Sequence, residues 1–253
     1  MNGAENKIDY LKGNLDEGSF IAILQEVKPT LASLLRDEFG GQGIFLYSLD
    51  FRPPGKYDSG ARELGVAIIA SDDIEVRGSG VLPRSLMPDR TLWADLHVEG
   101  QDMRVFGLHS ITGCDHVMAK SYQFLSYAEA VDEMRPDIVG IDANEPKVDG
   151  YSAEEMTFFK QRSRDNGAPT FFRTMEECGL RDSLIRNVDT SRPIEGRCIT
   201  CSHVIRSSKD KVRYDFVYLN GSRFIDYSCR YDYDGAVKAG SDHAAITVDM
   251  KLC

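Results

Sequence analysis

The chain has 253 residues, 42% of them hydrophobic and 28% charged, and its formal net charge at pH 7 is −10. No apolar stretch approaches the roughly 20 residues that a membrane-spanning helix needs, and the first residues lack the basic and then apolar pattern of a signal peptide. The acidic balance argues against a protein that merely coats nucleic acid, because phosphate contacts dominate that kind of binding. We therefore expect a soluble, cytoplasmic and monomeric protein, folded as a single domain over residues 1–253.

The first part of the chain mixes helical and strand patterns. Lys7–Leu15 carries apolar residues at helical spacing, and Phe20–Leu24 is a short apolar run typical of a buried strand. Pro29 favours the first turn of a second helix, which glycines at 40 and 41 end. Further strands are predicted at Ile44–Leu49, Leu64–Ala70, Thr91–Val98 and Met103–Leu108.

The rest of the chain continues this mixture. A long helix is expected to end near Met134, because Pro136 follows it. Ser152 and Glu155 have the spacing of a capping box, which predicts a helix that reaches Phe159. Apolar runs predict one more helix and three more strands: Thr170–Cys178 for the helix, and Ile138–Ile141, Phe216–Leu219 and Ala244–Met250 for the strands.

Strands outnumber helices in this prediction, and several strands follow one another directly. Such strands pair antiparallel, as expected for Thr91–Val98 and Met103–Leu108 across the turn at 99–101. The segment Tyr231–Asp234 is predicted to be a loop. The pattern favours an α/β fold in which two packed, mainly antiparallel sheets carry helices on their outer faces.

Six cysteines are scattered along the chain without a disulfide framework, so we expect mostly free thiols. Cys198 and Cys201 have zinc-knuckle spacing, but no second pair follows and His203 is the nearby partner. Structural zinc and a local disulfide are therefore minor alternatives at this pair.

Short polar clusters lie at the ends of several apolar runs. They are Gln25-Glu26, Leu108-His109-Ser110, Asp142-Ala143-Asn144, Tyr214-Asp215 and Ser241-Asp242-His243. Because the ends of neighbouring strands meet at a sheet edge, side chains placed this way can form one site. Carboxylates, amides and imidazoles gathered without a thiol nucleophile are typical of metal-assisted chemistry at phosphorus.

In chain order these clusters resemble the motifs of the endonuclease/exonuclease/phosphatase superfamily, which includes deoxyribonuclease I and exonuclease III. The resemblance runs from about residue 2 to residue 250. Each motif alone is weakly specific, whereas five in the same order at strand boundaries are strong together. The resemblance implies a four-layer α/β sandwich like that of deoxyribonuclease I, and metal-dependent hydrolysis of phosphoesters.

The resemblance also implies a site for Mg²⁺ or Mn²⁺. Glu26 would be a ligand, since Mg²⁺ prefers oxygen ligands and keeps several of its waters. Asp242 would lie near the same ion. In isolation Glu26 reads as an exposed residue before a helix, so its assignment depends on the other motifs.

Asp142 and Asn144 lie two residues apart at the end of a predicted strand. In an extended stretch both side chains would point the same way; an Asx-type turn after the strand is the alternative. The resemblance implies that Asp142 orients or deprotonates the attacking water and that Asn144 binds the phosphate or the metal shell.

Two histidines complete the predicted catalytic set. Asp215 and His243 would form a carboxylate–imidazole pair, in which the carboxylate fixes the tautomer and the imidazole acts as general acid or base. His109 would assist at the phosphate or the leaving oxygen, and the resemblance to deoxyribonuclease I implies Glu63 as its partner. The alternative for His243 is a histidine that only satisfies hydrogen bonds.

The start of the chain departs from the superfamily pattern. A strand ending in a motif like Trp-Asn-x-Asn-Gly normally opens the fold, but this sequence begins Met1-Asn2-Gly3. Asn2 matches the second asparagine of that motif and is a candidate substrate-binding residue. We therefore expect the first core strand to be missing, which would leave a sheet edge open.

The leading hypothesis is a divalent-metal-dependent phosphodiesterase, a nuclease that hydrolyses DNA. One alternative is a phosphatase or phospholipase of the same fold, acting on inositol phosphates or sphingomyelin. Another is a catalytically silent binding scaffold, which the missing strand favours and the intact set of catalytic residues opposes.

Overall fold

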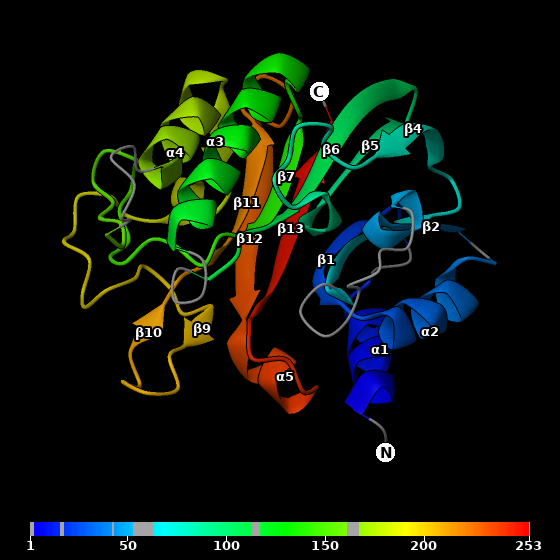
Figure 1. Cartoon of the computed structure of the whole chain (residues 1–253), viewed down its shortest axis with the longest axis horizontal. Helices are drawn as coiled ribbons and strands as arrows, with labels where there is room; N and C mark the ends of the chain where they lie inside the picture. The colour runs from blue at the N-terminus through cyan, green and yellow to red at the C-terminus, as the bar shows by residue number, and fades with distance from the viewer. Residues whose placement is uncertain are drawn as a thin grey trace.

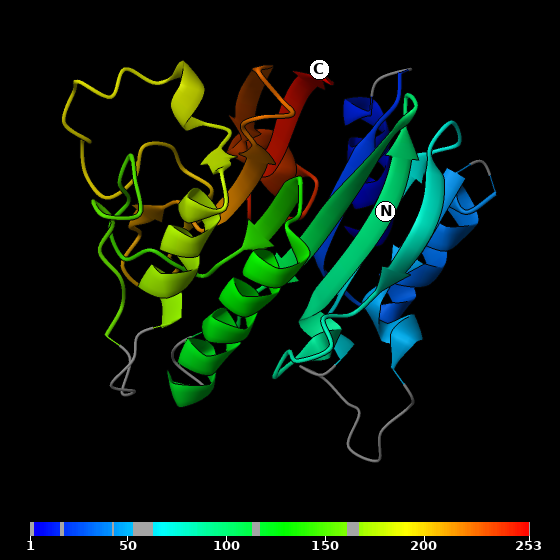
Figure 2. The same cartoon turned by 90° about the horizontal axis from the view of Figure 1, so that it is seen from above.

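The structure is a computed structural model that describes residues 3–15, 18–41, 43–52, 63–112, 117–160 and 167–252. Asn2, a predicted substrate-binding residue, lies outside these ranges. Figures 1 and 2 show the chain from two perpendicular directions, with strands in the middle and helices on both sides.

A six-stranded sheet forms one of the two middle layers. In spatial order it contains β4 (Glu75–Gly80), β5 (Thr91–Val98), β6 (Gln101–His109), β7 (Ile138–Asp142), β11 (Asp215–Asn220) and β8 (Leu180–Asp182). Neighbouring strands are antiparallel except β6 and β7, which are parallel. The predicted hairpin of β5 and β6 is confirmed, with Val98 opposite Gln101 at the turn.

The other middle layer consists of two smaller sheets. One has the spatial order β1 (Ile21–Val27), β3 (Gly65–Ser71), β2 (Gly43–Tyr47), and the other pairs β12 (Asp226–Asp232) with β13 (Ala245–Lys251). Both pack on the same core as the six-stranded sheet, since Ile23 of β1 and Val248 of β13 contact the cluster that includes Val105 of β6.

Helices form the two outer layers, as both views show. α3 (Val117–Met134) and α4 (Gly167–Glu177) cover the six-stranded sheet through a largely aromatic core, while α1 (Gly3–Asn14) and α2 (Pro29–Phe39) cover the three-stranded sheet. The predicted four-layer α/β sandwich is therefore confirmed. No helix in the described ranges is both long enough and apolar enough to cross a membrane.

Smaller elements complete the fold. The short helix α5 (Tyr233–Lys238) and the hairpin of β9 (His203–Val204) and β10 (Lys211–Val212) lie toward one end of the strands (Figure 1). Short 3₁₀ helices span Ser48–Phe51, Pro88–Arg90 and Ile185–Asn187.

The helix predicted from the capping box does not form. Ser152 instead begins a single turn, in which the Glu155 N–H donates to the Ser152 carbonyl, and Thr157 then pairs with Val148 in an isolated bridge. Phe158 packs against the core under α3 and α4. Burial of this aromatic ring on an extended backbone overrides the local helix signal.

The segment Tyr231–Asp234, predicted to be a loop, is regular structure. It ends β12 and begins α5, where the Asp232 carboxylate caps the helix by accepting from the Gly235 N–H at 2.9 Å. The Tyr231 hydroxyl donates to the Asp215 carbonyl at 2.8 Å. This tyrosine therefore supports the sheet edge from behind.

Candidate active site

Four of the predicted catalytic residues meet where the central strands end. In the strand register His109 of β6 lies opposite Asp142 of β7, and Asp142 lies opposite Asp215 of β11. His243, two residues before β13, places its Nδ1 atom 2.8 Å from Asp215 Oδ2 and 4.0 Å from Asp142 Oδ2. Strand pairing thus gathers residues that are more than 100 positions apart.

The Asp215–His243 pair is formed as predicted. Burial alone would lower the pKa of His243, but the Asp215 carboxylate, by its charge and its hydrogen bond, raises this pKa to about 10. The imidazole is therefore protonated at neutral pH and carries a positive charge into the site.

Asp142 is the buried member of the cluster, with 4% of its surface exposed. Burial, and next the negative charge of Asp215, raise the pKa of its carboxyl to about 7. Ligand atoms of Asp142, Asp215 and His243 lie within 4.8 Å of one another, which among the described residues is the one such group able to hold a metal ion. Buried negative charge of this kind fits a divalent cation, which would relieve the repulsion.

Asn144 does not continue the strand. Its backbone has a left-handed φ of 49°, and its N–H donates to Asp142 Oδ1 at 3.1 Å. The expected extended geometry is therefore wrong, and the Asx-type turn is the one that forms. The turn aims the Asn144 amide at the Ser110 carbonyl, to which Nδ2 donates at 2.9 Å, so Asn144 stays beside the site.

His109 is buried, with 1% of its surface exposed. The Arg90 guanidinium lies 2.8 Å from its Nδ1 and 2.9 Å from its Nε2, and Glu26 Oε1 lies 3.4 Å from Nε2. Burial, and next the charge of Arg90, hold the pKa of His109 well below its usual range. This histidine is therefore neutral, and Arg90, which the sequence analysis did not single out, brings a second positive charge.

Glu26 reaches the site through an irregular strand end. The pairing of β1 with β3 shifts register between Leu24 and Val27, and Glu26 has a φ of 55°. Such strain in a residue other than glycine is concentrated at functional sites. The side chain is 54% exposed, so its carboxylate faces both His109 and the solvent, where a hydrated cation could bind.

Asp242, the other predicted metal ligand, lies at the rim. Its exposed carboxylate is 3.4 Å from Arg206 Nη2, and its backbone carbonyl lies 2.8 Å from His203 Nδ1. Asp242 therefore borders the Asp215–His243 pair, while its carboxylate faces the hairpin of β9 and β10.

Glu63 is not the partner of His109. The carboxylates within 4 Å of this imidazole, among the described residues, belong to Glu26 and Asp142. Glu63 instead lies close enough to Tyr47 to raise the pKa of that phenol, although burial of the ring is the larger cause. The residue precedes β3, whose first residue pairs opposite Val27, and this register places it past the end of β1.

Three polar side chains of α3 support the site from behind and were missed in the sequence. Gln123 Nε2 and the Tyr127 hydroxyl donate to the His109 carbonyl at 3.1 and 3.0 Å, and Lys120 Nζ donates to the Asn144 carbonyl at 2.6 Å. All three are buried. The sequence pattern that could have revealed them is a set of polar residues at helical spacing on an otherwise apolar helix face.

The cysteine pair does not form a zinc site in the described residues, since the metal-binding group there is Asp142, Asp215 and His243. Cys198 and Cys201 are free thiols. His203, their suggested partner, instead packs its ring on His243, with ring centroids 4.4 Å apart.

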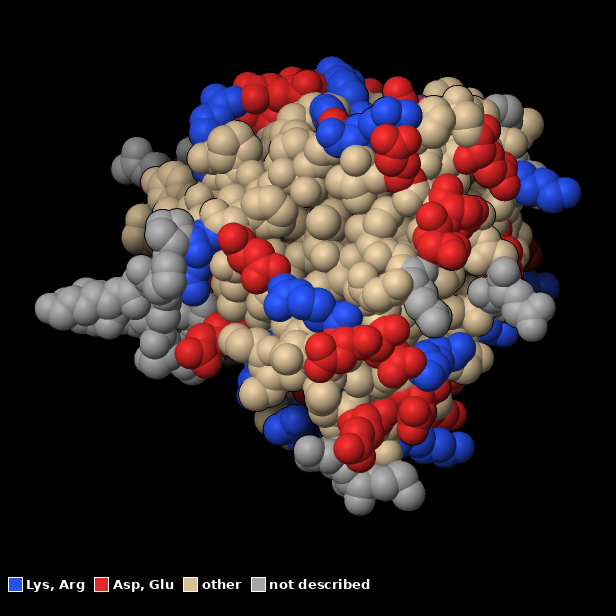
Figure 3. Space-filling model, turned by 90° about the vertical axis from the view of Figure 1, so that its right-hand side faces the viewer, with Lys and Arg blue, Asp and Glu red and all other residues tan. Residues whose placement is uncertain are grey.

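Most arginines near the site are engaged by carboxylates. Arg213 is fully buried between Asp149 and Asp182, at 2.8 and 2.7 Å, so it supports the fold and cannot face a substrate. On the side of the molecule shown in Figure 3, acidic and basic side chains alternate around an uncharged centre, and its described residues form no continuous basic surface.

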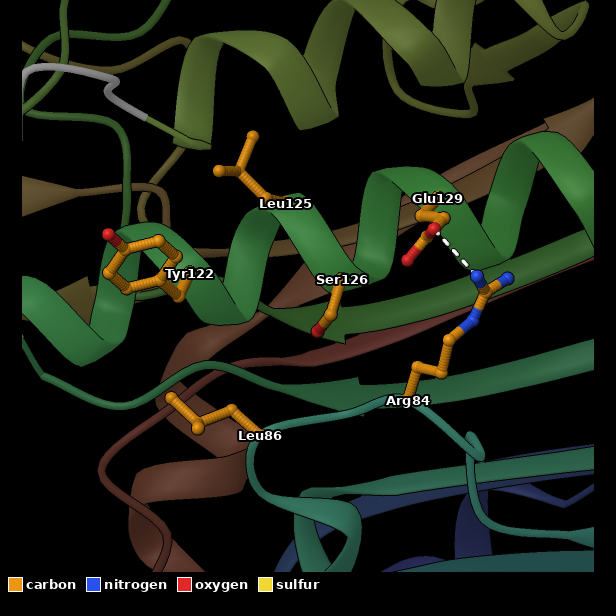
Figure 4. A pocket seen from close by; sticks show the side chains of 6 residues that line it. All are labelled: Arg84, Leu86, Tyr122, Leu125, Ser126 and Glu129. Atoms are coloured by element: carbon orange, nitrogen blue, oxygen red, sulfur yellow. Dashed lines mark ion pairs between the residues drawn. The ribbon is translucent and has the colours of Figure 1, made fainter.

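A separate hollow of about 600 Å³ lies between α3 and the segment before β5. The Arg84–Glu129 ion pair, at 2.9 Å, lies at one end and Tyr122 at the other (Figure 4). None of its lining residues belongs to the catalytic cluster, which therefore lies elsewhere.

Comparison with known proteins supports the fold. No protein-family model matches the sequence, and no curated protein matches it. Solved structures do match. An AP endonuclease from Archaeoglobus fulgidus has 18% identity and a TM-score of 0.62, covering 96% of this chain and 92% of that one. An endonuclease/exonuclease/phosphatase from Bacteroides vulgatus has 16% identity and a TM-score of 0.63, with coverages of 99% and 90%.

A third similar structure is D. rerio TDP2 complexed with a single-strand DNA product, with 14% identity and a TM-score of 0.59 over 98% of this chain and 91% of that one. At these identities the likeness establishes the fold. The chain therefore has the fold of these structures, a deoxyribonuclease I-like four-layer sandwich, as its motifs predicted.

Proposed function

We propose that this chain is a divalent-metal-dependent phosphodiesterase, a nuclease that hydrolyses DNA as a monomer in the cytoplasm. The observation that carries the proposal is the 2.8 Å Asp215–His243 pair beside Asp142, at the strand ends of this fold. Two of the similar structures are an AP endonuclease and a TDP2 bound to a DNA product, which supports a nucleic acid as substrate.

A Mg²⁺ or Mn²⁺ ion would be held by the Glu26 carboxylate, with Asp242 near it at the rim and the Asp142 carboxyl beside it on the attacking water. When bound, such an ion polarises a phosphoryl oxygen and stabilises charge on the leaving group. The donor set fits, because buried carboxylates crowd one another here and the exposed Glu26 carboxylate leaves room for the waters that Mg²⁺ keeps.

The side chains of the site would have different catalytic roles according to their charge. Asp142, whose carboxyl pKa is raised to about 7, would orient the attacking water and accept its proton. The protonated His243 would face the phosphate, where its positive charge stabilises the transition state. Asn144 would hold a phosphate oxygen. Because His109 is buried and neutral, it would act through Arg90, which it orients.

A phosphatase or phospholipase of the same fold is the second candidate. It is favoured by the pairing of arginines with carboxylates near the site, as in Arg206 with Asp242 and Arg197 with Asp210. Long nucleic acids are usually held by several free basic side chains, whereas a small phosphoester needs few.

A substrate panel tests these proposals. Plasmid DNA, single-stranded DNA, abasic duplex, RNA, inositol phosphates and sphingomyelin would each be incubated with Mg²⁺, with Mn²⁺ and with EDTA. We expect metal-dependent cleavage of one or more DNA substrates, abolished in His243→Ala protein of unchanged melting temperature. Hydrolysis of the small phosphoesters alone would favour the second candidate. No hydrolysis by folded protein at any metal concentration would reject both.

A further inference from the structure

His203 lies directly against the catalytic pair. It begins β9 and forms an isolated antiparallel bridge with His243. The two imidazole rings have centroids 4.4 Å apart and planes inclined by 33°. The Tyr214 ring stacks on His203 at 5.8 Å, so His203 is in ring contact with two residues that border or form the site.

The backbone around His203 is fixed by both strands that carry the catalytic pair. The Ser202 hydroxyl accepts from the N–H groups of Tyr214 and Asp215 at 2.8 and 3.2 Å, and the Ala244 N–H donates to the Ser202 carbonyl at 2.7 Å. Ser202 is fully buried. The position of His203 therefore follows β11 and the start of β13 closely.

The His203 ring is itself held in one orientation. Its Nδ1 lies 2.8 Å from the Asp242 carbonyl, and since a carbonyl only accepts, Nδ1 must carry the hydrogen that is donated. Because Nδ1 is hydrogen-bonded and one ring face packs on His243, the His203 side chain is fixed in orientation and does not rotate freely.

The orientation of the His243 imidazole depends on a fixed neighbour of this kind. Within the described residues this imidazole has one close side-chain hydrogen bond, from Nδ1 to Asp215, and 23% of the side chain is exposed. One hydrogen bond leaves rotation about the side-chain torsions incompletely restricted, and small displacements of a catalytic group lower turnover strongly. Contact with a fixed neighbouring ring removes that freedom.

We propose that His203 is a positioning residue, whose ring face holds the His243 imidazole in line with Asp215. The inference rests on the proposed function, because it assigns His203 a part in the same site. It predicts that a flat ring packed between Tyr214 and His243 is the main requirement of the position, and that the Nδ1 hydrogen bond to the Asp242 carbonyl adds a smaller part of the restraint. A phenylalanine should therefore replace His203, whereas alanine or leucine should not.

The first test reads the hydrogen bond itself and needs no substrate. Proton NMR of ¹⁵N-histidine-labelled protein would follow the low-field Nδ1–H signal of His243, assigned by its loss in His243→Ala. We expect the signal to persist in His203→Phe and to broaden or vanish in His203→Ala and His203→Leu. His97→Ala is the matched control. His97 lies near the end of β5 that is farther from His109, and its ring pairs with Asp102.

The second test is kinetic and uses the substrate found in the panel. We expect kcat to fall about 10- to 100-fold in His203→Ala, with KM changed less than threefold, and His203→Phe to recover most of the loss. Equal melting temperatures exclude general damage. If His203→Ala keeps both the NMR signal and kcat, or if His203→Phe is as impaired as His203→Ala, the inference is wrong. If no substrate is hydrolysed, the proposed function fails while the NMR result still decides the role of His203.

Discussion

Single residues in this site differ in charge because their surroundings differ. Asp142 and Asp215 are both buried carboxyls, yet Asp215 is paired with His243 at 2.8 Å, while Asp142 lies 4.0 Å from that imidazole. The pKa of the unpaired Asp142 carboxyl rises to about 7, and the pKa of His243 beside Asp215 rises to about 10. Environments that shift the pKa values of neighbouring groups in this way are how acid and base roles are assigned.

Substitution of His243 or Asp215 should lower the turnover number. We expect His243→Ala to lower turnover by roughly 10²–10⁴-fold, the usual scale for a lost acid–base group, and Asp215→Asn to be milder because the imidazole remains. Neither should change KM much. Steady-state kinetics on protein of normal melting temperature checks this. Near-normal turnover in His243→Ala would mean that this histidine only satisfies hydrogen bonds.

Metal binding is tested at Glu26. We expect Glu26→Gln to weaken Mn²⁺ binding while leaving the fold intact, because glutamine keeps the shape but removes the negative charge that a divalent ion prefers. Isothermal titration calorimetry measures the affinity. Glu99→Gln is a matched control, since Glu99 also has a left-handed φ, of 50° against 55° for Glu26, but lies in the β5–β6 turn. Equal affinity in the Glu26 variant would remove this residue from the ligand set.

Stability should depend on pH through His243. Its pKa is raised to about 10 in the folded protein, against about 6.5 in an unfolded chain. The folded state therefore holds a proton that the unfolded state loses, so the stabilisation is complete below pH 6.5 and disappears as the pH rises through 10.

The measurement is urea unfolding of the wild type and of His243→Gln between pH 6.5 and 10, with EDTA present. We expect the wild type to lose stability relative to the variant by up to about 1.4 kcal/mol per pH unit. His97→Gln, at the far end of the sheet, should follow the wild type. Parallel curves for wild type and His243→Gln would show that the Asp215 pair does not hold the proton.

The sequence predicted those site residues whose meeting follows from strand ends alone. His109, Asp142 and Asp215 converge because their strands are neighbours in register, and His243 reaches Asp215 from the segment that precedes β13. Arg90 and His203 were not predicted, since their contacts depend on how a 3₁₀ helix and a short hairpin fold back onto the sheet. Such tertiary contacts leave no periodic pattern in the sequence.

At the level of elements, apolar runs were reliable, as were the proline and glycine signals that bound α2 and end α3, whereas the capping box was not. β3 and β7 were predicted nearly to the residue, because a strand buried on both faces must be continuously apolar. β5 was predicted from a run in which more and less buried positions alternate. The capping box at Ser152 failed because one capped turn cannot stabilise a helix by itself. Strand β12 was missed because its sequence, Asp226–Asp232, is polar on alternate positions and lies at the surface.

Close packing between the two middle layers makes a prediction for β6. A Cβ atom at Gly107 would lie 2.7 Å from Val66 Cγ1 and 2.9 Å from Ile23 Cγ2, and both neighbours are β-branched and stiff at χ1. We expect Gly107→Ala to lower the free energy of unfolding by about 1–3 kcal/mol, the usual range for overpacking. Denaturant unfolding measures it.

Gly78 of β4 provides the control for that substitution. A Cβ atom there would meet the Trp93 ring at 3.5 Å, an ordinary contact, so Gly78→Ala should change the stability by less than about 0.5 kcal/mol. If both variants were equally stable, the approach of the layers at Gly107 would have to be looser than described.

In the molecule as a whole, the second middle layer is divided into two separate sheets, β1-β3-β2 and β12-β13. β1 and β13 each have one partner among the described strands, so the other edge of each carries unpaired backbone groups. The two strands lie next to one another in this layer in both views (Figures 1 and 2), and both pack on the core beneath. Among the described strands, these two edges therefore separate the two sheets of this layer.

These edges should accept one more strand. β1 and β13 have seven residues each, and the Gly3 carbonyl at the start of α1 lies 4.0 Å from where a Cβ on Gly240 would be. A strand leading into α1 would therefore end beside the segment that carries His243.

We expect a seven-residue extension ahead of Met1, with alternating valine and threonine, to raise the melting temperature by at least about 2–4 °C, the shift that 1 kcal/mol produces in a domain of this size. An extension of the same length made of glycine and aspartate is the control, because it cannot pair as a strand. Equal melting temperatures for both extensions and the unextended chain would mean that β1 and β13 do not accept a strand between them.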